Sequence, residues 1–536
     1  MRTFKRLISA IMPVMLIAAL MLSSCSKQEV KEGNIIPKDA AFVTCIDFGS
    51  IWEKGEMDKL NDLGSIKEMR QMLQNQNPSL DKFVGELLQD PSSSGIDMKD
   101  NLLYFSANQN KDVIYVMTCK MKDADAFESF FKKTTVMAGG REEDVKFEKD
   151  SKSGLSYMDI GGLIIAYNDD RFLSVWPEGR ARISLLDYAN DLLNMDEKQS
   201  IATSESFNEY WKNRGDFSYY MDFANFMNIM DNSSNKEFSY ALALLPKDFS
   251  EAFDKMSLYY AVSFEKGAIE IKSETIGVPE SIDKIRDQKF NKDLIKYMPE
   301  KALIAGTFAF NTENLVALFD DVKGPGNLLN QHIDIKNYRI KDVINAFGGS
   351  VAIDFYGMMN NETPAIAVAL DIKDKNVIKD ILAELGLDKD GNIYSDRYDE
   401  NQYIYLGDDV VIFSTDADVM KKASRGGYSE GMKNIAEKAG EGNYFYMELD
   451  PKKYPQVLLD EIDEDLFERY YYDYYTEDYK SYVDEEGRDT FYSILGWFKN
   501  VEITTDNSKS ITKINLADDT DNSLAFIIKQ LDRLSR

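Results

Sequence analysis

The chain has 536 residues, which is too many for one ordinary hydrophobic core, so we expect two or more domains. Hydrophobic residues make up 44% of the sequence, enough to build packed cores, and this excludes a disordered chain. The formal net charge is -29, and such an acidic surface repels nucleic acid and anionic headgroups, so no nucleic-acid partner is expected.

The first 24 residues predict a signal peptide: a basic start at residues 2–6 precedes an apolar run at 7–22. That run is too short for a comfortable membrane-spanning helix, which needs about 20 residues. Leu22-Ser23-Ser24-Cys25 follows and resembles the lipobox of bacterial lipoproteins. The resemblance implies that the signal is cleaved before Cys25 and that Cys25 is acylated with fatty acids such as palmitate. This lipid is then expected to be the only membrane contact. The alternatives are a plain signal peptide with a chance cysteine, or an uncleaved anchor.

Residues 25–35 form a predicted flexible tether between the lipid and the folded body, because they are mostly polar and lack aromatic residues.

The folded body contains an internal repeat. Ile36-Pro37-Lys38-Asp39-Ala40 opens an apolar strand, and Met298-Pro299-Glu300-Lys301-Ala302 opens a similar one. Three further pairs of similar segments follow in the same order, at a steadily decreasing separation: 116–123 with 367–374, 165–170 with 404–409, and 220–223 with 446–449. An ordered series of this kind predicts tandem duplication followed by shortening of loops. We expect a first repeat over 36–277, a linker over 278–297 and a second repeat over 298–536.

The pattern of apolar residues in the first repeat predicts strands and helices in this order: strand 42–48, helices 66–73 and 80–88, strands 102–106 and 113–121, and helix 124–133. Asn168-Asp169-Asp170 is typical of a hairpin turn, because Asn and Asp tolerate left-handed backbone. Strands and helices with many hairpins predict an α+β class, in which two duplicated halves are each a largely antiparallel sheet covered by helices. A parallel doubly wound sheet is disfavoured, since no Gly-rich phosphate loop follows a strand.

Cys45 and Cys119 both lie in predicted strands. An exported compartment permits a disulfide between them if their strands are neighbours. Two separate buried thiols, acting as small hydrophobic groups, are the interpretation we favour.

No catalytic or metal-binding motif emerges from the sequence, and no cofactor is expected. His332 is the single histidine and lies in a polar stretch, which favours a surface loop over a catalytic base. Residues 388–392 resemble the start of an EF-hand loop, but Ile393 occupies the position where glycine is needed, so a plain turn is favoured.

The segment 460–489 is the strongest compositional anomaly, with a run of acids leading into seven tyrosines. It has no counterpart in the first repeat and is predicted to be an insertion. Tyr471 and Tyr475 are the candidate ligand contacts, because rings beside carboxylates suit sugars, cationic peptides or calcium. The favoured interpretation is an amphipathic helical cover on the outside of the second repeat.

The lipobox, the opening at 36–40 and the segment Met121-Lys122-Asp123 together resemble an uncharacterised lipoprotein family of Bacteroidales, a domain of unknown function. The resemblance implies an outer-membrane location and no established activity. Because 27–29 only partly matches a surface-export signal, both the periplasmic face and the cell surface remain open.

Three functions are compatible with the sequence. The first is a non-enzymatic envelope lipoprotein that binds or scaffolds a partner protein or polymer. The second is a glycan-binding lipoprotein that uses the tyrosine segment, and the third is a hydrolase that uses carboxylates. Acids gathered in one deep cleft would favour the hydrolase.

Overall fold

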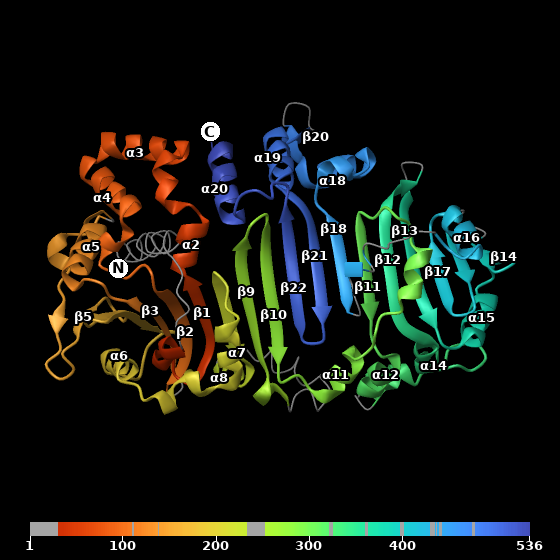
Figure 1. The fold of residues 1–536 in the computed structure, drawn as a ribbon, viewed down its shortest axis with the longest axis horizontal. Coiled ribbons are helices and arrows are strands. Elements are labelled where there is room, and N and C mark those ends of the chain that lie inside the picture. Colours follow the sequence, from red (N-terminus) through yellow and green to blue (C-terminus); the bar gives the residue numbers. More distant parts are fainter. Residues whose placement is uncertain are drawn as a thin grey trace. The chain divides into compact units, whose positions relative to one another are not determined.

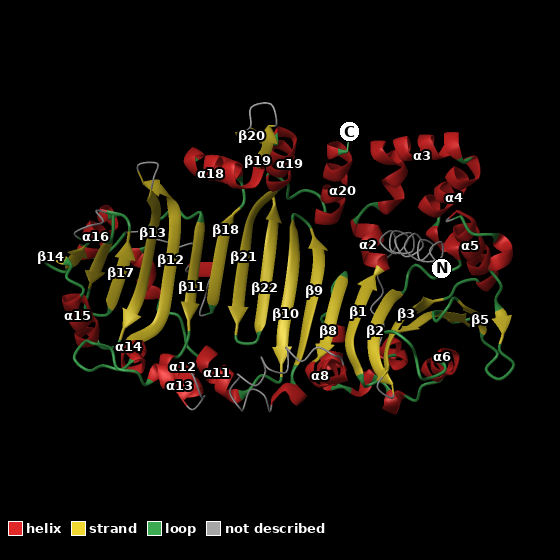
Figure 2. Ribbon diagram, turned by 180° about the vertical axis from the view of Figure 1, so that it is seen from behind, coloured by secondary structure: helices red, strands yellow, loops and turns green. Residues whose placement is uncertain are grey.

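The computed structural model describes residues 30–109, 112–137, 139–232, 252–320, 325–359, 363–396, 401–428, 435, 437–438, 442–473 and 478–535 (Figure 1). The chain separates into two compact units. Unit 1 comprises Met1–Tyr240, Phe253–Gly277 and Asp518–Arg536, and unit 2 is built from Val278–Ala517. The class is α+β, as the sequence predicts, and Figure 2 shows the strands and helices of both units.

The strands of unit 1 are β1 Ala40–Asp47, β2 Asn101–Gln109, β3 Asp112–Lys120, β4 Glu148–Lys149, β5 Ser156–Asp159, β6 Ile164–Tyr167, β7 Arg171–Pro177, β8 Phe217–Asp222, β9 Ser257–Glu265 and β10 Ala268–Ile276. Its helices are α2 Phe48–Lys54, α3 Gly64–Gln76, α4 Pro78–Gln89, α5 Ala124–Met137, α6 Leu185–Leu193, α7 Glu205–Lys212, α8 Phe223–Asn232 and α20 Ser523–Leu534. Short 3₁₀ helices are η1 Val30–Ile35, η2 Met57–Asp62, η3 Pro91–Ser94, η4 Glu142–Asp144, η5 Glu197–Gln199, η6 Ile201–Thr203 and η7 Phe253–Lys255.

The strands of unit 1 pair antiparallel in the order β4-β5-β6-β7-β3-β2-β1-β8-β9-β10. Local chemistry fixes the connections. The Asn168 side chain accepts hydrogen bonds from the backbone N–H groups of Asp170 and Arg171, which closes the predicted β6–β7 hairpin. Asp47 ends β1 and caps α2 by accepting a hydrogen bond from the Ser50 N–H at 2.9 Å.

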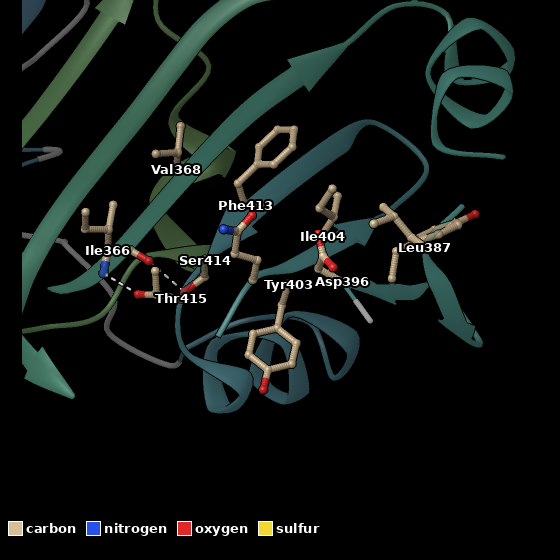
Figure 3. Close-up of a pocket in the computed structure, with 11 residues that line it drawn as sticks. Ile366, Val368, Leu387, Asp396, Tyr403, Ile404, Phe413, Ser414 and Thr415 are labelled. Carbon is tan, nitrogen blue, oxygen red and sulfur yellow. Dashed lines mark hydrogen bonds between the residues drawn. The ribbon is translucent and has the colours of Figure 1, made fainter. Parts of the chain in front are cut away.

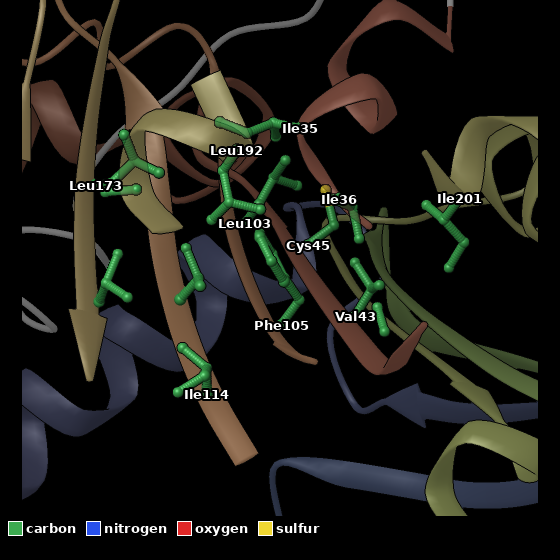
Figure 4. Close-up of a cluster of buried hydrophobic side chains, with 14 of the residues drawn as sticks. Ile35, Ile36, Val43, Cys45, Leu103, Phe105, Ile114, Leu173, Leu192 and Ile201 are labelled. Carbon is green, nitrogen blue, oxygen red and sulfur yellow. The ribbon is translucent and has the colours of Figure 1, made fainter. Parts of the chain in front are cut away.

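Both faces of the unit 1 sheet are apolar. The face that carries Val43, Leu103 and Phe105 packs under α6 and α7, and we call it the α6–α7 face (Figure 4). The opposite face carries Leu102 and Cys119 and packs, at one end of the strands, against Phe127 and Phe131 of α5 and Phe48 of α2; we call it the α5 face. Side chains alternate between the two faces along each strand, so unit 1 has a core on each side of one sheet.

The strands of unit 2 are β11 Ile304–Ala309, β12 Phe347–Met359, β13 Thr363–Ile372, β14 Asp388–Asp390, β15 Ile393–Ser395, β16 Tyr403–Leu406, β17 Val410–Ser414, β18 Asn443–Glu448, β19 Glu468–Asp473, β20 Asp478–Val483, β21 Phe498–Asp506 and β22 Lys509–Leu516. Its helices are α11 Glu280–Arg286, η8 Lys292–Tyr297, α12 Thr312–Asp320, α13 Pro325–Leu329, α14 Ile340–Asn345, α15 Lys375–Glu384, α16 Ala417–Ser424, η9 Pro451–Lys453, α18 Gln456–Phe467 and α19 Glu485–Leu495.

The main sheet of unit 2 has the antiparallel order β14-β15-β16-β17-β13-β12-β11-β18-β21-β22. This order matches that of unit 1 strand for strand when β11 is placed on β1. In the sequence, the hairpin β19–β20 lies between β18 and β21. Among the described strands, β19 and β20 pair only with each other. One face of the main sheet packs under η8 and α16, and the other packs under α15; we call them the α16 face and the α15 face.

The second unit differs from the expected second repeat at both ends. Residues 278–297 were expected to be a linker, but Leu294, Ile295 and Tyr297 are buried in the core of unit 2. The last helix, α20, belongs to unit 1 instead of unit 2. There the carboxylate of Asp532 accepts hydrogen bonds from the N–H groups of Gly64 at 3.2 Å and Ser65 at 2.7 Å, at the start of α3.

The tyrosine-rich segment also differs from the expectation of helices throughout. α18 and α19 are helical, but the tyrosine run between them forms the hairpin β19–β20. Tyrosine is enriched in strands because its ring packs well on a pleated surface, and this preference prevails over the helical interpretation.

Candidate functional site

An aromatic platform lies on the α5 face of unit 1, toward the end of the strands away from α5. It consists of one ring from each of five neighbouring strands: Trp176 on β7, Tyr115 on β3, Tyr104 on β2, Phe42 on β1 and Tyr219 on β8. These rings are brought together by strand register alone, since the five positions are scattered from residue 42 to residue 219.

The rings of the platform contact one another across the sheet. The centroid of Tyr104 lies 5.9 Å from that of Trp176 and 5.5 Å from that of Phe42. Phe42 stacks in turn on Tyr219 at 6.1 Å, and Tyr115 lies 6.2 Å from Tyr104. Each of the five rings is half-buried, so the platform is neither a closed core nor a set of isolated surface rings. Half-exposed aromatic clusters of this kind are typical of binding surfaces.

The hydroxyl groups of the platform are polar handles in an apolar setting. Burial raises the pKa of Tyr104 to about 12, so this hydroxyl stays protonated and is a hydrogen-bond donor at neutral pH. Burial, together with the nearby Glu178 carboxylate, raises the pKa of Tyr115. The Tyr115 hydroxyl donates to Glu178 at 3.4 Å, and Tyr260, opposite Tyr219 on β9, adds a ring that is 41% exposed.

A pocket of about 330 Å³ lies in unit 2, beside the core of the α15 face (Figure 3). Its lining comes from β13, β15, β16 and β17 and the turns next to them: Ile366, Val368, Leu387, Tyr394, Asp396, Gln402, Tyr403, Ile404, Phe413, Ser414 and Thr415. In Figure 3, Val368 and Phe413 project to the same side of the sheet and Tyr403 projects to the other. Strands β13 and β17 hold the places in unit 2 that β3 and β7 hold in unit 1, so the pocket overlaps the counterpart of the platform at two of its five strands.

An unusual carboxyl group is buried on the α16 face of unit 2. Asp354 on β12 is fully buried, and neither of its oxygens has a hydrogen-bond partner among the described residues. Its strand neighbours Ala305 and Ala367 are small and apolar. Burial raises the pKa of Asp354 to about 8, because the charged form loses its hydration there. The group is therefore mostly protonated at neutral pH.

The two internal cysteines are buried thiols and are not joined as a disulfide. Cys45 lies on β1 and Cys119 on β3, with β2 between these strands. They also face opposite sides of the sheet, since Cys45 belongs to the α6–α7 face and Cys119 to the α5 face. Burial raises the pKa of the Cys119 thiol to about 12, which makes it unreactive. The possibility of a cross-strand bridge is therefore not realised.

Other candidate residues from the sequence fall partly outside the structure. Cys25 and Tyr475 lie outside the described residues. Tyr471 lies on β19, and its side chain lies outside the description. His332 is exposed in a loop, where its Nδ1 is 2.9 Å from the Asn337 carbonyl oxygen. The EF-hand-like segment forms the β14–β15 hairpin with Gly391 at φ 60°, the turn that the sequence favoured.

The described residues contain no cluster of three or more His, Cys, Asp or Glu side chains that could hold a metal ion. Within the same residues, no helix is both long enough and apolar enough to cross a membrane.

Comparison with known proteins gives a family. A family model described as "Domain of unknown function (DUF4836)" matches residues 32–463. The chain belongs to this family. The match covers all ten strands of the unit 1 sheet. It also covers the strands of the unit 2 main sheet up to β18, and it ends within α18. No curated protein matches the chain.

Two solved structures are similar to this DUF4836 protein. "Structure of crystal form III of TP0453" is 8% identical, with 71% of this chain and 91% of that chain covered and a TM-score of 0.18. "Structure of crystal form I of TP0453" is 9% identical, with 73% and 94% covered and a TM-score of 0.17. Similarity at this level carries no argument about the function of the family.

Proposed function

We propose that this protein is a lipid-anchored protein of the outer membrane, on its periplasmic face or at the cell surface, that acts by binding a partner. The lipobox-like Leu22-Ser23-Ser24-Cys25 supports the anchor. The tether expected over residues 25–35 is shorter than predicted, because Val30–Ile35 forms the 3₁₀ helix η1 and Ile35 is buried in the core of unit 1. The resemblance to Bacteroidales lipoproteins supports the location.

The aromatic platform is the observation that carries the binding function. Large half-exposed rings side by side on a sheet contribute most of the energy of many protein interfaces, because they bury much area at little cost in side-chain entropy. A partner protein or polymer of the cell envelope that lies across the five strands would contact all five rings.

A glycan is the second candidate partner, and the tyrosines of the platform favour it. Tyr104, Tyr115 and Tyr219 each place a hydroxyl beside an apolar ring, the combination that meets both the hydroxyl groups and the C–H faces of a sugar. Hydrolysis has less support from the structure. Among the described residues that line the unit 2 pocket, Asp396 is the single carboxylate, whereas glycoside hydrolysis needs a pair.

We further propose that the two units arose by tandem duplication. The matching order of ten strands supports this, as do the paired sequence segments that open β1 and β11. Chance would have to reproduce the long-range pairings β1–β8 and β11–β18 in addition to the local hairpins. In this view the hairpin β19–β20 with α18 and α19 is an insertion in the second copy.

Capture of the partner from native membranes tests the binding function. The tagged full-length lipoprotein is purified with its bound proteins and glycans, beside the double variant Tyr104→Ala/Trp176→Ala. We expect the variant to lose capture about 30-fold, the effect of the 2 kcal/mol that defines a hot spot. Tyr157→Ala, which removes a tyrosine of unit 1 outside the platform, is the matched control. Equal capture by the platform variant and the wild type, at equal folded fraction, would contradict the proposal.

A further inference from the structure

A groove of about 800 Å³ lies between α4 and α5 of unit 1, and we call it the α4–α5 groove. Both helices face it with positions spaced i, i+3, i+4 and i+7, which form one stripe on a helix: 79, 82, 83 and 86 on α4, and 129, 132, 133 and 136 on α5. Its apolar lining includes Leu80, Phe83 and Val136, and the Val136 side chain is 48% exposed. Apolar surface in this groove is therefore open to water, and a partner that covers it gains free energy.

Three lysines line the groove, and their ion pairs are loose. Lys82 and Lys133 lie 3.9 Å and 4.0 Å from the carboxylate of Glu86, and Lys132 lies 3.9 Å from that of Glu128. These distances exceed the reach of a hydrogen bond. Surface pairs of this kind contribute little to stability, so the three ammonium groups can exchange these contacts for those of an acidic partner.

The lining combines positive charge with apolar surface. It holds three lysines against two glutamates, Glu86 and Glu142, in a chain whose net charge is -29. The Lys133 Nζ stands over the Phe83 ring, 5.6 Å from its centroid, so charge and apolar surface lie together. Among the chain neighbours of the lining residues, only residue 138 lies outside the described part, and it is an uncharged alanine. This combination suits an amphipathic helix with acidic side chains, laid along the groove.

The volume of the groove favours a segment of polypeptide over a small anion. At about 30 Å³ for each water-sized unit, 800 Å³ holds about 27 non-hydrogen atoms. The side chains on one face of a helix of two to three turns amount to about twenty such atoms. The groove therefore has room for one face of a short helix.

The chain itself carries an acidic amphipathic helix, α18 of unit 2. Val457, Asp460, Glu461 and Glu464 follow the same spacing of i, i+3, i+4 and i+7, and Asp465 lies one position further. The four acidic residues are exposed, and Val457 is half-buried. α18 therefore presents to solvent an apolar residue bordered by four carboxylates, which is the reverse of the charge pattern in the groove.

The exposed face of α18 carries an excess of negative charge. Asp460 and Glu464 are four residues apart, as are Glu461 and Asp465, and like charges at this spacing repel each other. The helix contains no lysine or arginine, and the Gln456 side-chain amide donates to Asp460 Oδ1 at 2.9 Å. Lysines brought by another molecule would relieve this repulsion.

We propose that α18 of one copy of this protein docks in the α4–α5 groove of a second copy. Val457 then lies on the apolar lining, and the acidic side chains of α18 lie between the lysines. The contact is heterologous, because each copy offers one groove and one helix, so further copies add in a row. It is separate from the aromatic platform and does not depend on the proposed function, and it uses the exposed face of α18 and not the tyrosines of the β19–β20 hairpin.

Charge reversal on each side tests the contact, in sedimentation velocity on the full-length lipoprotein in a neutral detergent. At about 0.15 M salt the Debye length is about 8 Å, so long-range repulsion between two acidic molecules is screened more than close ion pairs. We expect the wild type to self-associate as its concentration approaches the millimolar range. Lys132→Glu/Lys133→Glu in the groove, or Glu461→Lys/Asp465→Lys on the helix, should each weaken association at least about tenfold, because like charges then meet.

Combining these four substitutions in one chain restores both complementary charges and the wild-type net charge. Association should then return to within about threefold of the wild type. Lys149→Glu/Lys152→Glu is the matched control, because it reverses two exposed lysines of unit 1 outside the groove, and it should leave association nearly unchanged. Glu142→Lys removes a carboxylate from the lining and should strengthen association about threefold.

A wild type that stays monomeric throughout would overturn the proposal and leave the groove to a different partner. Association that survives reversal on either side, or that the folded quadruple variant does not regain, would also refute it. Circular dichroism verifies the fold of each variant. If a reversed variant does not fold, Glu142→Lys decides the question, and unchanged or weaker association in that variant would refute the contact.

Discussion

Asp354 occupies in unit 2 the sheet position that Phe105 occupies in unit 1. Phe105 on β2 pairs with Val43 and Val116, and Asp354 on β12 pairs with Ala305 and Ala367. Both side chains are completely buried. A row of large apolar side chains in one unit is therefore replaced in the other by two alanines around a carboxyl group.

The stability of unit 2 should depend on pH through Asp354. The unfolded chain releases this proton near pH 4, whereas the folded chain holds it to about pH 8. Between these values the unfolded state binds fewer protons, so stability falls as pH rises, by about 1.4 kcal/mol per pH unit for this group alone. Asp354→Asn removes the titration, so its stability relative to the wild type should increase from pH 5 to pH 8.

Urea unfolding at pH 5, 6, 7 and 8 measures that difference. Asp408→Asn is the matched control, because Asp408 is a fully exposed aspartate of the same unit. A difference between Asp354→Asn and the wild type that does not change with pH would contradict the prediction.

Asp532 should stabilise unit 1 by joining α20 to the start of α3. Its carboxylate accepts from the N–H groups of Gly64 and Ser65 and from the Ser65 hydroxyl, and Asp532 itself is buried. Asp532→Ala leaves these donors without an acceptor and should lower the free energy of unfolding by about 1–3 kcal/mol. Asp532→Asn keeps one acceptor oxygen and should lower the free energy of unfolding by a smaller amount. Chemical denaturation measures both, with the exposed Asp519→Ala as the control; an equal loss in Asp519→Ala would show that the effect is not specific to the contact.

Much of the strand and helix order could be predicted from the sequence, because apolar runs and turn residues are local signals. The expected strands 42–48, 102–106 and 113–121 correspond to β1, β2 and β3, and the expected helix 124–133 to α5. The position of α20 could not be predicted, because it depends on a contact between Asp532 and Ser65 that lies 467 residues apart in the chain.

The aromatic platform could not be found from the sequence, for the same physical reason. Tyr104 and Trp176 become neighbours only through the register of β2, β3 and β7. A weak local signal did exist: in β3, Tyr115 alternates with the core residues Ile114 and Val116 and so had to point to the other face. Without the strand order, nothing indicated that five such rings share one surface.

Lipid attachment at Cys25 stays a prediction, because that residue lies outside the described part of the chain. Cys25→Ala should move the protein from the membrane fraction to the soluble fraction, since several acyl chains are what make anchoring stable. Fractionation and metabolic labelling with a fatty-acid analogue measure this. Cys45→Ala is the control, because a buried thiol in β1 is not accessible for acylation. Label that persists in Cys25→Ala would refute the assignment.

The hairpin between α18 and α19 should act as a structural cover and not as a binding surface. Phe467 at the end of α18 is buried against Phe491 of α19, so the segment has a small core of its own at its base. If the segment is a cover, replacing Tyr471 and Tyr475 with alanine should lower the melting temperature and leave partner capture intact, because those rings would then contribute packing only. Thermal unfolding and capture from native membranes, run on the same preparation, measure the two effects. Loss of capture at an unchanged melting temperature would instead make the hairpin a binding surface, and the platform variant Tyr104→Ala/Trp176→Ala, assayed in parallel, would show whether both surfaces serve the same partner.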